Sequence, residues 1–167
     1  MSDMFNGAEL FNSDLSGWNV KNVSDMKRMF AEAKSFNSNL NNWDVSKVLD
    51  MSGMFDNAQS FNGDIASWNV SKVTNMSQMF LNSAVFNGMI GNWNVSNVIN
   101  MNRMFENAAS FNRDLSNWCV SKISNKPTNF DTNTASWSLP KPNWGQCGND
   151  SHNSGGSGGS GAGSSGN

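Results

Sequence analysis

The 167-residue chain contains no tyrosine, one histidine, two cysteines and three prolines, and only 14% of its residues are charged. The histidine, His152, lies in a Gly- and Ser-rich stretch near the C-terminus, so no Ser-His-Asp or Cys-His catalytic arrangement is expected in the folded part. Zinc sites need several Cys or His ligands, and the chain does not supply them. We therefore expect a non-catalytic protein with no metal and no cofactor.

Charge and hydropathy narrow the set of partners. The net charge is -2 and the pI is near 5.2, so the chain has no basic footprint for nucleic acid or anionic membranes. No apolar run approaches the length of a membrane span, and membrane insertion is not expected. The first residues, Met1 to Phe5, have neither a basic region nor an apolar core, so no signal peptide is visible.

The sequence does contain one unit of 25 residues that recurs about five times, and Leu40 to Asn62 is a representative stretch of it. Its apolar residues form columns in phase: Trp18, Trp43, Trp68, Trp93 and Trp118; Val20, Val45, Val70, Val95 and Val120; Met26, Met51, Met76 and Met101; Phe11, Phe36, Phe61, Phe86 and Phe111. Such a period with in-phase apolar columns predicts a solenoid in which each coil contacts only its neighbours.

The apolar spacing changes within each unit. From Leu40 to Val45 it includes the alternation typical of a strand, whereas Val48 to Ala58 shows offsets of three, four and seven, typical of a helix. Residues with favoured N-cap side chains precede the Met column in every unit: Asp25, Asp50, Asn75, Asn100 and Asn125. The pattern therefore predicts one short strand and one short helix per coil.

The repeat Leu-x-x-Trp-x-Val-x-x-Val-x-x-Met-x-x-Met-Phe-x-x-Ala-x-x-Phe-Asn resembles that of the BspA-like leucine-rich-repeat surface proteins, over roughly residues 4 to 130. The ending, Lys141 to Cys147, also resembles how such arrays terminate. The resemblance implies an α/β fold: a right-handed leucine-rich-repeat-like solenoid with a parallel strand ladder on one face and short helices on the other. A β-solenoid is the alternative. The resemblance further implies an extracellular or cell-surface location and a role in adhesion or protein binding.

We divide the chain into a repeat solenoid at 1–130, a C-terminal cap at 131–150 and a flexible Gly/Ser-rich tail at 151–167. The first coil is partial, and its exposed edge could support end-to-end self-association. The fifth unit decays, since Lys126 replaces the column Met and Pro127 follows it. One last short helix is expected near Lys126 to Phe130.

The two cysteines, Cys119 and Cys147, lie in the fifth unit and in the cap. A disulfide between them would close a loop of roughly 28 residues and stabilise the cap by about 3 kcal/mol. The alternative is two free thiols in a reducing compartment.

A column that could suggest stacked calcium ligands is interrupted by Met89 and lacks Gly-rich Asp repeats, so a solvated turn is the better interpretation. The Met columns are expected to be core packing. The best candidate surface is the outward side of the predicted strands. It comprises Asn42, Asp44, Ser46, Ser67, Asn69, Ser71, Asn92, Asn94, Ser96, Asn117 and Ser121.

This surface is neutral and rich in hydrogen-bonding groups, which suits a protein or glycan ligand. The alternatives are a solvated face with no ligand, or a structural spacer or self-assembling rod. Ice or mineral binding is disfavoured because in-phase Thr is scarce.

Overall fold

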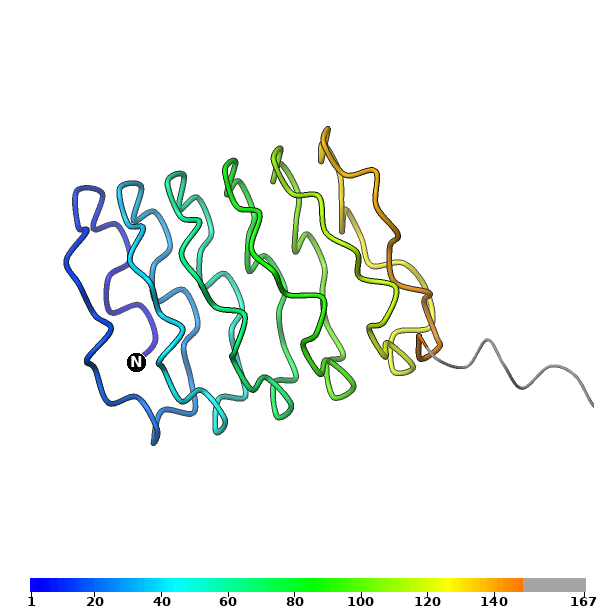
Figure 1. Ribbon diagram of the computed structural model, residues 1–167, viewed down its shortest axis with the longest axis horizontal. Coiled ribbons are helices and arrows are strands. Elements are labelled where there is room, and N and C mark those ends of the chain that lie inside the picture. Colours follow the sequence, from blue (N-terminus) through cyan, green and yellow to red (C-terminus); the bar gives the residue numbers. More distant parts are fainter. Residues whose placement is uncertain (149–167) are drawn as a thin grey trace, which may run out of the picture.

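The computed structural model describes residues 1–148, which form a stack of similar coils with about one repeat in each coil (Figure 1). These residues contain no helix and no extended strand. The β-type pairing between successive coils in these residues is limited to three isolated parallel bridges, Asp25 with Asp50, Asp50 with Asn75, and Asn75 with Asn100. The predicted α/β fold, with one strand and one helix per coil and a parallel strand ladder, is therefore wrong. The alternative β-solenoid has no more support, because isolated bridges do not make a sheet.

The backbone hydrogen bonds explain why no helix forms. The N–H groups of Met26, Arg28 and Phe30 donate to carbonyl oxygens of the next coil at 2.9 to 3.0 Å. The intervening N–H group of Met29 closes a turn within its own coil by donating to the Met26 carbonyl at 3.2 Å. An α-helix needs each N–H group to bond four residues back along the chain. Here alternate N–H groups point along the stack instead.

Left-handed backbone conformations also interrupt this segment. Two residues per coil have positive φ, for example Arg28 at 50° and Glu32 at 58°. A right-handed helix has negative φ throughout, so neither residue can belong to one. The equivalents of Glu32 in the next three coils are Asn57, Asn82 and Asn107, and Asn is the side chain that tolerates this conformation best. The segment expected as a last helix, from Lys126 to Phe130, likewise forms turns.

The expected strand is also replaced by turns. The N–H group of Trp43 donates to the carbonyl of Leu40 at 3.0 Å, and Val48 donates to Val45 at 2.9 Å. A strand would direct these groups to neighbouring strands instead. The alternation of apolar residues in this stretch thus indicates which side chains face the core. It does not indicate an extended backbone.

The apolar columns of the sequence lie in the interior. Phe30 stacks on Phe55 at a centroid distance of 5.6 Å, and Phe55 stacks on Phe80 at 5.7 Å. A second file runs beside the first, with Phe36 and Phe61 at 5.9 Å. Within each coil the two rings also stack, as Phe30 and Phe36 do at 4.0 Å. Like residues of successive coils therefore contact one another through the core, and all of these rings are fully buried.

A third file consists of tryptophans. Trp43, Trp68 and Trp93 stack with centroid distances of 6.5 and 6.2 Å and are 3–4% exposed. Each indole N–H donates to a carbonyl of the preceding coil; that of Trp68 donates to Leu40 at 2.9 Å. A buried indole needs such a partner. Trp therefore joins adjacent coils both by packing and by a hydrogen bond.

The Asn column forms a ladder of side-chain bonds along the stack. The Oδ1 atom of Asn12 accepts a hydrogen bond from the backbone N–H of Asn37 at 2.8 Å, and Asn37 does the same for Asn62. The ladder continues through Asn87 to Asn112, which accepts from Ser138 and Leu139. This column is structural, because its side-chain oxygens hold the next coil in place.

The two ends of the stack differ. In the first coil Trp18 is 41% exposed, and Phe5 and Phe11 are only partly buried. At the other end Trp137 packs edge-on against Phe111 at 4.8 Å and is 7% exposed.

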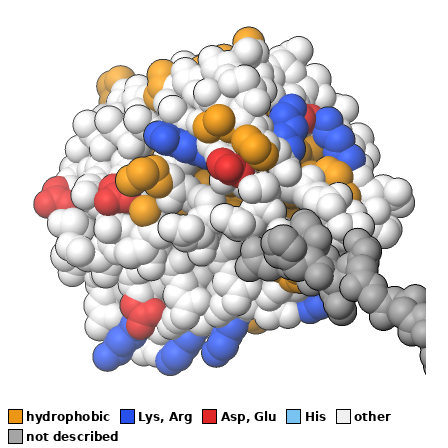
Figure 2. Space-filling model, turned by 45° about the vertical axis from the view of Figure 1, so that its right-hand side comes forward, with side chains coloured by type: hydrophobic (Ala, Val, Ile, Leu, Met, Phe, Trp, Pro, Cys, Tyr) orange, Lys and Arg blue, Asp and Glu red, His pale blue; other side chains and the backbone are white. Residues whose placement is uncertain are grey.

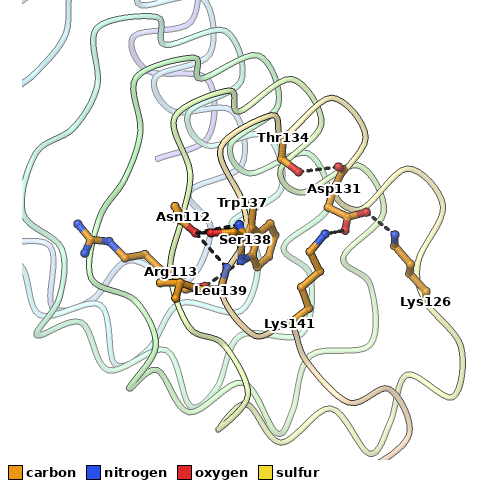
Figure 3. A network of polar contacts seen from close by, with 9 residues as sticks. All are labelled: Asn112, Arg113, Lys126, Asp131, Thr134, Trp137, Ser138, Leu139 and Lys141. Atoms are coloured by element: carbon orange, nitrogen blue, oxygen red, sulfur yellow. Dashed lines mark hydrogen bonds and ion pairs between the residues drawn. The ribbon is translucent and has the colours of Figure 1, made fainter.

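Polar contacts reinforce the C-terminal end (Figure 3). The indole N–H of Trp137 donates to the Arg113 carbonyl at 2.9 Å. The buried Asp131 carboxylate pairs with both Lys126 and Lys141. The division of the chain into solenoid, cap and tail stays a prediction, and residues 151–167 lie outside the described residues. No helix within residues 1–148 is suited to span a bilayer.

Asp56 is a half-buried carboxyl beside another acid. Burial and the nearby Glu32 carboxylate raise its pKa to about 6, against the opposing influence of Arg103, Asn82 and Arg28. Its charged form therefore costs the folded state free energy above pH 6.

Replacing Trp68 with Phe should lower the free energy of unfolding by about 2–4 kcal/mol, because it leaves a void and removes the only hydrogen bond of the indole. Trp18→Phe is the matched control. The Trp18 indole makes no hydrogen bond within residues 1–148, so we expect a loss of less than about 1 kcal/mol. Urea unfolding followed by circular dichroism measures both. Equal losses would contradict the structural role of the Trp file.

Asp56→Asn should stabilise the protein by about 1 kcal/mol at pH 7.5, because it removes a charge that folding partly desolvates. The folded pKa of Asp56 lies above the ordinary aspartate value of 3.8, so the folded state binds the extra proton between pH 4 and 6. The advantage of the variant should therefore shrink as the pH falls through 6 and vanish near pH 4. Glu32→Gln should shift this transition to lower pH. Thermal unfolding across this range checks both, and a variant advantage that does not change with pH would refute the assignment.

Candidate functional site

The predicted surface residues lie along one edge of the stack, at turns that follow one another from coil to coil. We call them the turn face, defined as Asn42, Asp44, Ser46, Ser67, Asn69, Ser71, Asn92, Asn94, Ser96, Asn117 and Ser121. All are exposed except Ser46, Ser71 and Ser96, which are half-buried. They do not project from strands, as the sequence pattern suggested, because the described residues have none there.

One column of the turn face fixes the turns. The Oδ1 atom of Asn94 accepts hydrogen bonds from the N–H of Ser96 at 3.2 Å and from its hydroxyl at 2.7 Å. Asp44 accepts in the same way from Ser46, and Asn69 from the N–H of Ser71. These Asx turns hold the local backbone in place. The side-chain oxygens of this column are therefore already occupied.

The Asp44 carboxylate differs from its Asn equivalents in charge. The Ser46 hydroxyl and N–H hold the pKa of Asp44 below its usual value. Asp14 and Asp114, which cap other turns through Ser16 and Ser116, have pKa values lowered by the same kind of contact. These carboxylates act as acceptors for turns, which accounts for the column that could have suggested calcium. Within residues 1–148 no group of three or more Cys, His, Asp or Glu could hold a metal ion.

A second column of the turn face is available for contacts. The side chains of Asn42, Asn92 and Asn117 make no hydrogen bond within residues 1–148, so their amides face solvent with both donor and acceptor capacity. Ser67 is the exception, since its hydroxyl donates to the Asn41 carbonyl at 2.7 Å. Figure 2 shows mostly neutral side chains on the side of the molecule drawn there, with Lys and Arg along the lower edge and again near the top, and with acidic and hydrophobic side chains between them.

The cysteines bound the turn face at the C-terminal end of the stack. Cys119 and Cys147 form a disulfide, as the sequence predicted. Beside it, the N–H of Val120 donates to the Gln146 carbonyl at 2.8 Å. A Cβ atom at Gly148 would lie 2.2 Å from the Ser116 carbonyl oxygen, so only glycine fits there. The C-terminal segment therefore runs along the fifth coil where another coil would otherwise stack.

A feature that sequence reasoning missed is an open cleft of about 530 Å³. It lies between the coil of residues 88–112 and the coil that begins at residue 113, which are the fourth and fifth coils when the coil of residues 13–37 is counted as the first. Its walls are formed by Ile99 to Asn102 on one side and Lys122 to Thr128 on the other. The available signal was the loss of the Met column at Lys126 together with Pro127. That change was interpreted as a helix start and not as a separation of coils.

The comparisons with known proteins agree with the repetitive architecture. The family model described as "Mycoplasma protein of unknown function, DUF285" matches the chain twice, over residues 1–82 and 62–146. No curated protein and no solved structure matches the chain. The two matches together cover most of the sequence, so the chain belongs to the DUF285 family.

Proposed function

We propose that the protein is a non-catalytic repeat module that binds a protein or glycan through the turn face. The observation that carries this proposal is the column Asn42, Asn92 and Asn117, whose amides are exposed and have no partner within residues 1–148. Neighbouring Asx turns fix the backbone beneath them, so these donors and acceptors are presented with little loss of freedom on binding.

An extracellular or cell-surface location is part of the proposal. The Cys119–Cys147 disulfide supports it, because disulfides persist in oxidising surroundings. The resemblance of the repeat to the BspA-like leucine-rich-repeat surface proteins, and through it the role in adhesion, supports it as well. Neither nucleic acid nor membrane insertion belongs to the proposal, which involves no cofactor.

The double substitution Asn42→Arg and Asn92→Arg tests the turn face. Both side chains are exposed and make no hydrogen bond within residues 1–148, so the melting temperature should stay within about 2 °C of the wild type. A glycan array and a pull-down with extracellular matrix proteins identify a wild-type partner. We expect the double variant to lose at least tenfold in affinity for it, because two bulky cations cover the face.

Asn94→Ala serves as the matched control, because it removes a turn cap from the same face without adding bulk. It should lower stability by about 1 kcal/mol and weaken binding less than the double variant does. Full binding by the folded double variant would exclude the turn face as the contact surface.

A second candidate function is a structural spacer or rod that associates through its first coil. The exposed Trp18, at 41% against 3% for Trp43 in the next coil, favours it, and Leu10 adds an exposed apolar side chain at 91%. Analytical ultracentrifugation should then show association that grows with concentration and is lost in the variant Leu10→Glu with Trp18→Glu. A wild type that stays monomeric at millimolar concentration would rule this function out.

A further inference from the structure

The regular pairing of coils stops at the fourth coil. Between the third and fourth coils, Met76 N–H donates to the Asn100 carbonyl and Ile99 N–H donates to the Thr74 carbonyl, both at 2.9 Å. The two preceding bridges have the same pair of bonds. Within residues 1–148, the equivalent bonds between the fourth and fifth coils, from Met101 to Asn125 and from Ser124 to Ile99, are not formed.

The sequence explains why this bridge is lost. In earlier coils the Oδ1 atom of the bridging residue accepts from the N–H two residues on, as Asn75 does from Ser77 at 3.1 Å. The fifth coil carries one extra residue before this point. Phe130 N–H donates to the Pro127 carbonyl as Met104 N–H donates to the Met101 carbonyl, an offset of 26 residues (130 against 104) instead of 25, so the bridging residue and its turn are displaced. Pro127 is buried at the place of the column Met, whereas Lys126 is exposed and its ammonium pairs with Asp131.

The result is the open cleft of about 530 Å³ described above, which is large enough for a small ligand. Its floor is apolar, formed by the buried side chains of Met101, Ile123 and Pro127. Met101 is 0% exposed, so its unbonded N–H group is withdrawn from bulk solvent and costs free energy until it finds an acceptor.

Each wall of the cleft has one backbone N–H group and one backbone carbonyl group without a hydrogen-bond partner within residues 1–148, as at the edge of a strand. One wall offers the Ile99 carbonyl and the Met101 N–H; the other offers the Ser124 N–H and the Asn125 carbonyl. An extended peptide carries the N–H and carbonyl groups that pair with all four, as the backbone of Thr74 to Met76 pairs with the coils on both sides of it.

We propose that the cleft between the fourth and fifth coils is a binding site for an extended peptide segment resembling the chain's own bridging sequence, which completes the interrupted backbone ladder. The preferred segment has a small apolar or β-branched residue, then Asn or Asp, then Met, as in Val73 to Ser77. A glycan does not supply an N–H and a carbonyl at the spacing of successive residues, so a peptide fits the four groups better. This site is separate from the turn face.

The experiment uses the full chain labelled with nitrogen-15 and a blocked pentapeptide with the sequence of residues 73–77, Val-Thr-Asn-Met-Ser. Its Thr N–H would donate to Ile99 and its Met N–H to Asn125, so a peptide N-methylated at both positions is the control ligand. We expect saturable shifts of the Met101 and Ser124 amide signals, and at least tenfold weaker binding of the methylated peptide.

Deleting Lys126 and replacing Pro127 with Met restores both the 25-residue spacing and the column Met, and should close the cleft. This variant should melt at a higher temperature than the wild type, and its Met101 signal should not respond to the peptide. Should this variant not fold, deleting Ser124 alone, which restores the spacing and retains the Lys126–Asp131 pair, serves the same purpose.

Several outcomes would overturn the proposal. One is the absence of a response at Met101 and Ser124 up to millimolar peptide, and another is an equal response of the closed variant. A third is a response confined to Ser24, because the first coil also offers an unpaired edge within residues 1–148. A response of Met101 to N-acetylglucosamine trimer but not to the peptide would assign the cleft to glycans instead.

Discussion

The fold depends on each coil using its neighbours to satisfy its backbone. Alternate N–H groups in the Met–Phe segment donate to the next coil, and the indole of every interior Trp donates to the preceding one. Without a neighbour these groups would be left unpaired, and burying an unpaired backbone group costs about 1–3 kcal/mol. The stacking of like rings adds apolar contact along the same axis. The free energy of folding therefore comes mainly from the contacts between adjacent coils and less from contacts within a single coil.

This dependence separates what the sequence could predict from what it could not. The columns of Trp, Met and Phe predicted correctly which side chains face inward and that like residues touch. Met26, Met29, Phe30 and Ala33 are spaced as on a helix, yet they lie on successive turns. The spacing of apolar residues indicates which side chains point toward the core. It does not indicate which groups accept the backbone hydrogen bonds. The bonds to the next coil and the positive φ at Arg28 and Glu32 exclude a helix, and neither residue type predicts them.

The Asn and Asp residues show the same limit. Asp25 and its equivalents were interpreted as helix N-caps, and their side chains do accept an N–H two residues on, as Asp25 does from Lys27 at 2.8 Å. The predicted side-chain hydrogen bond is therefore present, but the helix predicted to follow it is not. An Asx turn and a helix N-cap both begin with this bond, so the bond does not distinguish them. For the turn face, exposure was predictable from the alternation. The occupation of Asp44, Asn69 and Asn94 as caps was not, since it depends on turn geometry.

A repeat protein binds a ligand most specifically at positions where its sequence departs from the repeat. A surface that repeats identically in every coil offers a ligand several equivalent registers, and only its edges distinguish one register from another. The Cys119–Cys147 disulfide and the segment beside it give the turn face such an edge. The cleft between the fourth and fifth coils is unique for the same reason, because Pro127 and Lys126 occur in one unit only. The one extra residue in the segment around Lys126 and Pro127 thus leaves backbone groups unpaired between two coils, and these groups form the proposed peptide site.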